Sequence, residues 1–106
     1  MNMNIQHRNG AARILHFLYG RGGSGAHIRE IADACGLSPV TVNGYLCSLR
    51  SNAFLSTVTC LIHRTGYDYK DHPPFVQNRT GTGFWRISSE GKEFYGKLQF
   101  HSPDWK

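Results

Sequence analysis

Residues 27 to 49, HIREIADACGLSPVTVNGYLCSL, decide the expected fold of this 106-residue chain. Ile28, Ile31 and Ala32 recur at the spacing of one helix face, which predicts a first helix. Gly36 follows it and can take the positive φ that often ends a helix. The segment therefore begins with a helix and a tight turn.

A second helix is expected over about residues 38–52. Ser38 is a good N-cap, and Pro39 suits the first helical position. The buried stripe of this helix is expected to be Val42, Leu46 and Leu49. A helix, a short turn with glycine and a second helix are the parts of a helix-turn-helix, whose second helix can enter the DNA major groove.

Two segments resemble the bacterial or phage-type winged helix-turn-helix transcriptional regulators, at the level of the superfamily. The first holds Ile31-Ala32-Asp33, Gly36-Leu37-Ser38, Thr41-Val42 and Tyr45-Leu46, and the second is Phe84 to Lys92. The resemblance implies an α+β winged helix, with a three-helix core, a β-hairpin wing and a C-terminal helix. It also implies sequence-specific DNA binding in transcription regulation.

The first third of the chain is expected to supply a further helix and a short strand. Asn9 can cap a helix that carries its apolar residues on one side and ends at Gly20. The glycine-rich segment from Gly20 to Gly25 lacks the Gly-Lys-Ser/Thr ending of a phosphate-binding loop, so we expect a flexible connector. Ala26 and His27 are expected to form a short strand.

The β-branched residues of segment 54–63 favour a strand, with Gly83 to Ile87 as its partner. The long loop between these strands is the expected wing, over about residues 64–82. Ser88 then caps a last helix whose apolar side contains Phe94, Tyr95 and Leu98. One domain is expected over residues 1–106, with polar tails at about 1–8 and 101–106.

Composition fits a basic cytoplasmic protein. The formal net charge is +5, which suits a polyanion partner. Three cysteines at unrelated spacings do not form a disulfide framework, and the N-terminus is too polar for a signal peptide. We expect free thiols, a cytoplasmic location and no association with membranes.

The second helix of the pair is the expected DNA-reading element. A step of about 100° per residue places Val40, Gly44, Cys47 and Ser51 on its outward line. The same geometry places Thr41 and Ser48 on one flank and Asn43 and Arg50 on the other. Such a small-residue face can enter a major groove deeply, where Asn43 could bond an adenine and Val40 could touch a thymine methyl.

This helix carries no Lys or Arg before Arg50. Basic residues elsewhere in the chain must therefore neutralise the DNA phosphates. The candidates are Arg29, Arg64, Lys70, Arg79 and Arg86, with Arg79 the favoured residue for minor-groove insertion. The full set of expected DNA-binding residues is Ser38, Val40, Thr41, Asn43, Gly44, Tyr45, Arg50, Arg29, Arg64, Lys70 and Arg79. The expected partners are double-stranded DNA and a second copy of the chain, which would dimerise through the first or last helix.

Other functions stay open or are disfavoured. The neutral face of the second helix and the acids in the expected wing fit a protein-binding adaptor as the alternative, and RNA binding is a third possibility. Gly44 leaves the same choice open, because either DNA or a partner helix could approach it closely. Cys60 and His63 have ligand-like spacing, but two ligands do not make a metal site. No catalytic motif is present, so neither an enzyme nor a cofactor is expected.

Overall fold

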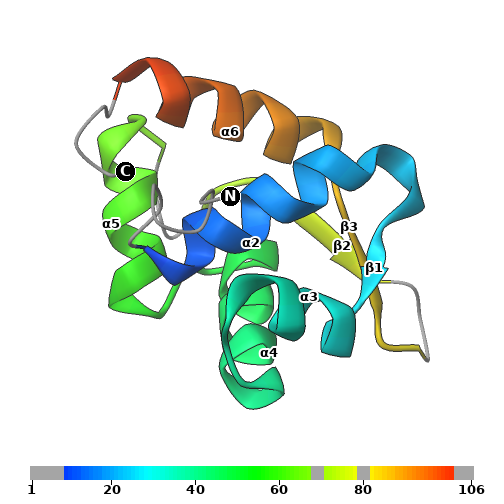
Figure 1. The fold of residues 1–106 in the computed structure, drawn as a ribbon. Helices are drawn as coiled ribbons and strands as arrows, with labels where there is room; N and C mark the ends of the chain where they lie inside the picture. Colours follow the sequence, from blue (N-terminus) through cyan, green and yellow to red (C-terminus); the bar gives the residue numbers. More distant parts are fainter. Residues whose placement is uncertain (1–8, 68–70, 79–81, 102–106) are drawn as a thin grey trace.

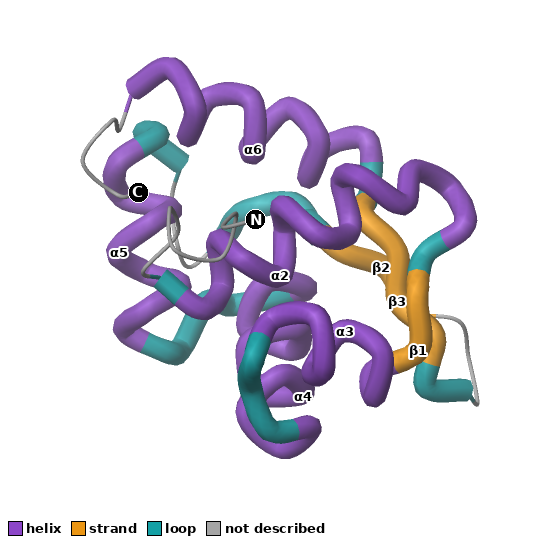
Figure 2. The backbone as a smooth tube through the Cα atoms, viewed as in Figure 1, coloured by secondary structure: helices purple, strands orange, loops and turns teal. Residues whose placement is uncertain are grey.

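The computed structural model describes residues 9–67, 71–78 and 82–101, and the fold within these ranges is α+β (Figure 1). The helices are α2 (Gly10–Arg21), α3 (Ile28–Cys35), α4 (Pro39–Arg50), α5 (Ser56–Arg64) and α6 (Ser89–His101). The strands are β1 (Ala26–His27), β2 (Val76–Asn78) and β3 (Phe84–Ile87), and a 3₁₀ turn, η1, covers Gly22–Ser24. The predicted α+β class is confirmed, with the small sheet to one side of the helices (Figure 2).

Helix α2 packs against all four of the other helices. Asn9 caps it as predicted, because its Oδ1 accepts hydrogen bonds from the N–H groups of Ala11 and Ala12 at 2.9 and 3.1 Å. The Asn9 amide also donates to the Thr57 carbonyl at 3.1 Å, which ties the start of α2 to α5. The fully buried apolar residues of α2 are Ala11, Ala12, Ile14, Leu15 and Leu18. The glycine-rich segment after α2 contains η1 and leads directly into β1.

The predicted pair of helices at residues 28–50 is confirmed. Gly36 ends α3 in the left-handed region with φ of 69°. Ser38 caps α4, since its Oγ accepts a hydrogen bond from the Thr41 N–H at 3.2 Å, and Pro39 occupies the first helical turn. The buried residues of α4 include the predicted Val42, Leu46 and Leu49. These local cues place α4 across the end of α3 (Figure 1).

The strand predicted over residues 54–63 is wrong, because this segment forms α5. Its buried positions have helical spacing, and they are Val58, Leu61 and Ile62. The Thr59 hydroxyl donates to the carbonyls of Ala53 and Leu55, both at 3.1 Å, so a β-branched residue is accommodated inside the helix. Burial of one apolar face against α2, α4 and α6 thus overrides the β propensity of the individual residues.

The sheet has the order β1-β3-β2, and both pairings are antiparallel. Strand β3 confirms the strand expected at Gly83 to Ile87, and β1 confirms the short strand at Ala26 and His27. Ala26 faces Trp85 in one pairing, and Gln77 faces Arg86 in the other. The partner of β3 that the sequence prediction missed is β2.

The wing expected over about residues 64–82 is therefore wrong in extent. Arg64 is the last residue of α5, and β2 lies inside the segment that was expected to be a loop. The hairpin actually joins Asn78 to Phe84, so it is much shorter than predicted. Lys70 and Arg79 lie outside the described residues, as do the predicted tail at 1–8 and residues 102–106 of the tail predicted at 101–106. His101, the first residue of that predicted tail, is the last residue of α6.

Phe75 joins α4, the sheet and α6. Its N–H donates to the Leu49 carbonyl at 3.1 Å, and its carbonyl accepts from the Ser88 N–H at 3.1 Å. Its ring stacks with Phe94 and with His72, at centroid separations of 4.2 and 4.8 Å. Both backbone groups of this buried residue are thereby satisfied, as burial requires.

Ser88 begins α6 as predicted. Its Oγ accepts from the Gly91 N–H at 2.9 Å and donates to the Pro74 carbonyl at 2.6 Å. The predicted apolar residues Phe94, Tyr95 and Leu98 are all buried. With 13 residues, α6 is the longest described helix, and no helix in the described ranges is long and apolar enough to cross a membrane.

Gly91 and Gly96 offer a matched pair of substitutions within α6. A Cβ at Gly91 would lie 2.0 Å from the Phe75 carbonyl oxygen and 2.7 Å from Ile87 Cγ1, whereas a Cβ at Gly96 would meet no atom of the described residues within 4 Å. We expect Gly91→Ala to lower the free energy of unfolding by about 1–3 kcal/mol through overpacking against backbone. Gly96→Ala should raise it by about 0.5–1 kcal/mol, because alanine is the better helix former.

Urea denaturation of the two variants and the parent measures both changes. A destabilised Gly91→Ala beside a stabilised Gly96→Ala supports the close approach of α6 to Phe75. Equal effects of the two substitutions would contradict that close approach.

Candidate nucleic-acid interface

The outward side of α4 is built from small, uncharged residues. Val40 is 83% exposed, and Asn43 and Ser51 are also exposed. Gly44 and Cys47 lie between them and are half-buried. Val40, Gly44, Cys47 and Ser51 are the residues that the sequence predicted for the outward line of this helix. Asn43 was predicted to flank that line. The predicted outward line is thus confirmed at Val40 and Ser51, whereas Gly44 and Cys47 are partly covered, with Cys47 packed against the core.

Ser48 departs from the prediction, because it is fully buried and does not flank the outward line. Its Oγ accepts hydrogen bonds from the N–H groups of Phe54 and Leu55 at 3.1 and 3.3 Å. These N–H groups belong to the connection between α4 and α5, which is not helical and therefore supplies no backbone acceptor of its own. The Ser48 hydroxyl holds this connection against the end of α4, and Phe54 is left 64% exposed.

Two further predicted contact residues take part in the fold itself. The Ser38 hydroxyl donates to Thr41 Oγ1 at 2.9 Å, so both side chains are engaged in the cap of α4. The Tyr45 ring lies against the start of α2, where a Cβ on Gly10 would come within 2.7 Å of Tyr45 Cε2. Ser38 remains exposed, while Thr41 and Tyr45 are half-buried.

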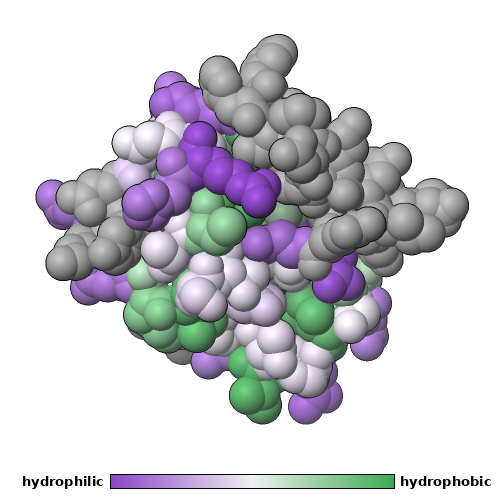
Figure 3. Space-filling view, turned by 90° about the vertical axis from the view of Figure 1, so that its left-hand side faces the viewer, coloured by the Kyte–Doolittle hydropathy of each residue, from purple (hydrophilic) through white to green (hydrophobic). Residues whose placement is uncertain are grey.

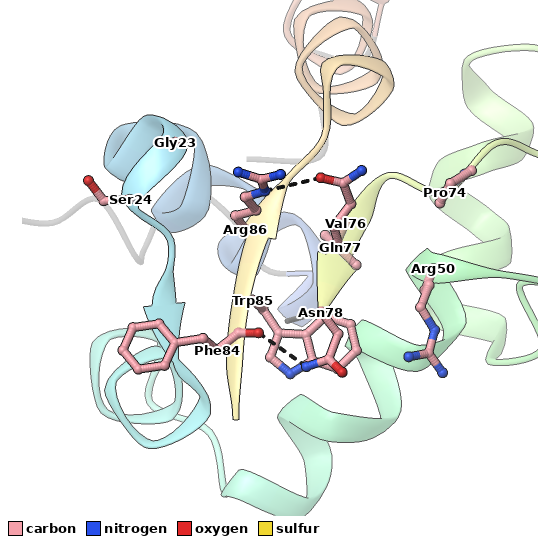
Figure 4. A pocket seen from close by; sticks show the side chains of 10 residues that line it. All are labelled: Gly23, Ser24, Arg50, Pro74, Val76, Gln77, Asn78, Phe84, Trp85 and Arg86. Atoms are coloured by element: carbon pink, nitrogen blue, oxygen red, sulfur yellow. Dashed lines mark hydrogen bonds between the residues drawn. The ribbon is translucent and has the colours of Figure 1, made fainter. Parts of the chain in front are cut away.

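A groove of about 640 Å³ begins where α4 ends, and Figure 4 shows the side chains that line it. Arg50, the last residue of α4, places its guanidinium over the Trp85 ring with Cζ 5.4 Å from the ring centroid. Arg86 stands on β3, and its Nε donates to Gln77 Oε1 on β2 at 3.1 Å. Two arginines from separate elements thus line one groove.

The remaining wall of the groove combines an aromatic ring with an amide. Phe84 is 44% exposed and meets His27 of β1 edge-on, with ring centroids 5.7 Å apart. The Asn78 amide donates to the carbonyls of Thr82 and Phe84 at 3.3 and 3.1 Å, which fixes the base of the hairpin. The alternation along β3 explains the arrangement, since Phe84 and Arg86 are exposed while Trp85 and Ile87 are buried.

The charge around α4 and the hairpin has one sign. The sequence contains no Asp or Glu from Gly36 to Tyr67, or again from His72 to Ser89. These two stretches hold α4, α5, β2 and β3, and none of the ten residues that line the groove is acidic. The acids of the described residues are Glu30, Asp33, Asp71, Glu90 and Glu93. A polyanion could therefore approach α4 and the groove without meeting a carboxylate on either.

The other basic residues that were predicted to contact DNA lie in two different regions of the fold. Arg29 is exposed in the first turn of α3, next to β1. Arg64 ends α5, and the chain beyond it leads to Tyr67, which contacts Phe94 and Lys97 of α6. Arg64 is exposed at the end of α5 and does not line the groove beside the hairpin. Of the predicted basic residues, Arg50 and Arg86 line the same groove, and Arg29 and Arg64 do not.

The groove residues Phe84, Gln77 and Asn78 were missed in the sequence interpretation. The alternation in Phe84-Trp85-Arg86-Ile87 could have assigned Phe84 and Arg86 to one face. No comparable pattern marks Gln77 and Asn78, because β2 has only three residues and follows Pro73 and Pro74. A strand this short is specified by its pairing with β3.

The cysteines and histidines do not assemble into a metal site in the described part of the chain, where no cluster of three potential ligands occurs. Cys60 and His63 are both exposed on α5, one turn apart. Cys35 is buried, and its burial raises the pKa of the thiol to about 11 despite the nearby Arg13. Cys35 is therefore a protonated packing residue at neutral pH.

Searches of protein-family models, of curated protein sequences and of solved structures found no match to this chain.

Within the described fold, packing does not require residue 44 to be glycine. A Cβ there would lie 3.5 Å from Leu55 Cδ1, which is an ordinary van der Waals contact. We expect Gly44→Ala to raise the free energy of unfolding by about 0.5–1 kcal/mol, because glycine is a poor residue for a helix interior. Urea denaturation measures the change, and Gly20→Ala in α2, where no atom lies within 4 Å, is the control. A destabilised Gly44→Ala beside a stabilised Gly20→Ala would show that Leu55 cannot make room.

Proposed function

We propose that the chain is a winged-helix protein that binds double-stranded DNA in transcription regulation. In this proposal α4 enters the major groove, and the β2–β3 hairpin forms the wing on the adjacent backbone. The observation that carries it is the acid-free surface of α4, β2 and β3, with Arg50 and Arg86 lining opposite sides of one groove (Figure 4). Sequence specificity is assigned to α4 and affinity for the backbone to the arginines.

The helix-turn-helix geometry supports the first part of the proposal. Helix α4 has an exposed line without bulky or charged side chains, so its backbone can approach base edges closely. Asn43 is exposed on the flank of this line, and its amide suits the two hydrogen-bonding positions of an adenine edge. Val40, exposed at the start of α4, offers an apolar contact to a thymine methyl.

The groove beside the hairpin supports the second part. Guanidinium groups bind phosphate oxygens through paired N–H donors, and Arg50 and Arg86 present two such groups from different elements. Arg29 adds a third exposed cation at the start of α3. The neutral outward face of α4 is consistent with this division, because the phosphate contacts need not come from α4 itself.

A dimer would complete the proposed readout. One helix in the major groove contacts only a few base pairs, so a second copy on a half-site one helical turn away would supply the rest. Exposed Tyr19 on α2 and the adjacent α6 offer one surface for this contact. Neither catalysis nor a cofactor is part of the proposal.

The alternative function is an adaptor that binds another protein through α4 and the adjoining side of α5. The large exposed areas of Val40 and Phe54 favour it, because apolar side chains at both ends of α4 are typical of protein contacts. Figure 3, which faces the side of α5, shows weakly polar and apolar residues over much of its centre and lower half. This surface and the arginine groove can be separated by mutation.

The arginine pair provides the test of DNA binding. We expect Arg50→Gln combined with Arg86→Gln to weaken binding to duplex DNA of any sequence, because both changes remove a cation that neutralises phosphate. The slope of log binding constant against log salt should become shallower by about 0.9 for each phosphate that is no longer neutralised. Fluorescence anisotropy with a duplex pool at several salt concentrations measures both quantities.

The control is Arg64→Gln combined with Lys92→Gln, which removes the same number of charges from α5 and α6. This variant should bind with a nearly unchanged salt slope. Equal effects of the two double variants would show that net charge, and no defined surface, attracts the DNA. If the parent binds no duplex at low salt, the DNA proposal fails and the adaptor replaces it.

A further inference from the structure

A second groove, of about 360 Å³, lies between one side of α2 and the end of α3, and none of its lining residues belongs to β2 or β3. Helix α2 contributes Arg13, His16, Phe17 and Arg21 at the spacing of one helix face. Cys35 closes the groove at the end of α3. The lining thus combines two arginines with an aromatic ring, and the Glu30 carboxylate pairs with one of them, Arg21, from outside the lining.

Arg13 connects this groove with the turn between α3 and α4. Its Nη1 donates to the Cys35 carbonyl at 2.8 Å, and a Cβ on Gly36 would lie 3.9 Å from the same nitrogen. Its Nε is buried and has no hydrogen-bond partner among the described residues. A buried N–H without an acceptor costs free energy, so an acceptor that draws the guanidinium out of this position would relieve that cost.

Arg21 and Phe17 form the opposite end of the groove. The Arg21 guanidinium lies over the Phe17 ring, with Cζ 5.1 Å from the centroid, and it also pairs with Glu30 of α3. His16 bonds the Tyr95 hydroxyl through Nδ1, and burial lowers the pKa of its imidazole. His16 is therefore neutral at pH 7, and the positive charge of the groove comes from the arginines.

We propose that this groove binds a small organic monocarboxylate, with its apolar body on Phe17 and its carboxylate between Arg13 and Arg21, where it displaces Glu30 from Arg21. The carboxylate competes with the Cys35 carbonyl for Arg13, so occupancy alters the hydrogen bonding at the end of α3. The effect reaches Gly36, the left-handed residue that sets the angle between α3 and α4. The site does not depend on DNA binding, and it can be tested without DNA.

The test is a titration of the ¹⁵N-labelled protein with benzoate, followed by amide chemical shifts. Benzyl alcohol lacks the charge and acetate lacks the aromatic body, so these two compounds separate the two parts of the proposed ligand. We expect saturable shifts with benzoate at the amides of Phe17, Gly20, Cys35 and Gly36. Each control compound should bind at least about tenfold more weakly. Shifts that do not saturate, or that centre on Arg50 and Arg86, would overturn the site.

Gly20 allows a variant that blocks the groove and keeps the fold. It lines the groove, and a Cβ there would meet no atom within 4 Å. Gly20→Glu places a carboxylate beside the arginines and should raise the dissociation constant of benzoate by about tenfold or more through competition and repulsion. Gly20→Gln, which matches it in size, should change the constant far less.

Equal affinities of Gly20→Glu and Gly20→Gln for benzoate would contradict the proposed position of the carboxylate. Arg13→Gln provides a second measurement, and its fold is checked by its thermal transition. If the folded Arg13→Gln variant still shifts the Gly36 amide with benzoate, Arg13 does not link the groove to the turn.

Discussion

The backbone of Phe75 is the constraint on which the arrangement of α4 and the hairpin depends. Its N–H is bonded to the end of α4 at Leu49, and its carbonyl is bonded to the start of α6 at Ser88. Arg50 follows Leu49 directly, and Val76, the first residue of β2, follows Phe75. The same two hydrogen bonds therefore place Arg50 beside β2 and β3, so that a groove with two arginines forms there. Gly91 is needed because a side chain would displace the Phe75 carbonyl.

Local sequence signals were sufficient to predict the helices whose ends are marked by capping residues. Asn9, Ser38 and Ser88 each cap a helix with a side-chain oxygen, and Gly36 ends α3 with a positive φ. Each of these roles follows from one residue and its neighbours, without knowledge of distant contacts. The outward line of α4 could be predicted for the same reason, since helical geometry fixes it.

Elements that depend on distant contacts could not be predicted in this way. The segment that forms α5 has β-branched residues that favour a strand, and only its burial against other helices selects the helix. Ser48 was expected near the surface, but it is buried because the following connection needs an acceptor for two N–H groups. Of the groove, Arg50 and Arg86 were anticipated as single cations, and their position in one groove follows from the hydrogen bond between Phe75 and the end of α4 and from the pairing of β2 with β3.

The central claim is that α4 and the hairpin form one surface for duplex DNA. Amide chemical shifts of the ¹⁵N-labelled protein, recorded during titration with a DNA duplex at low salt, test it most directly. The account predicts that the largest shifts occur in α4 and in β2 and β3, including Arg50 and Arg86, while the exposed side of α6 around Glu93 changes little. Shifts confined to Phe54 and α5, or no shifts at any DNA concentration, would contradict it.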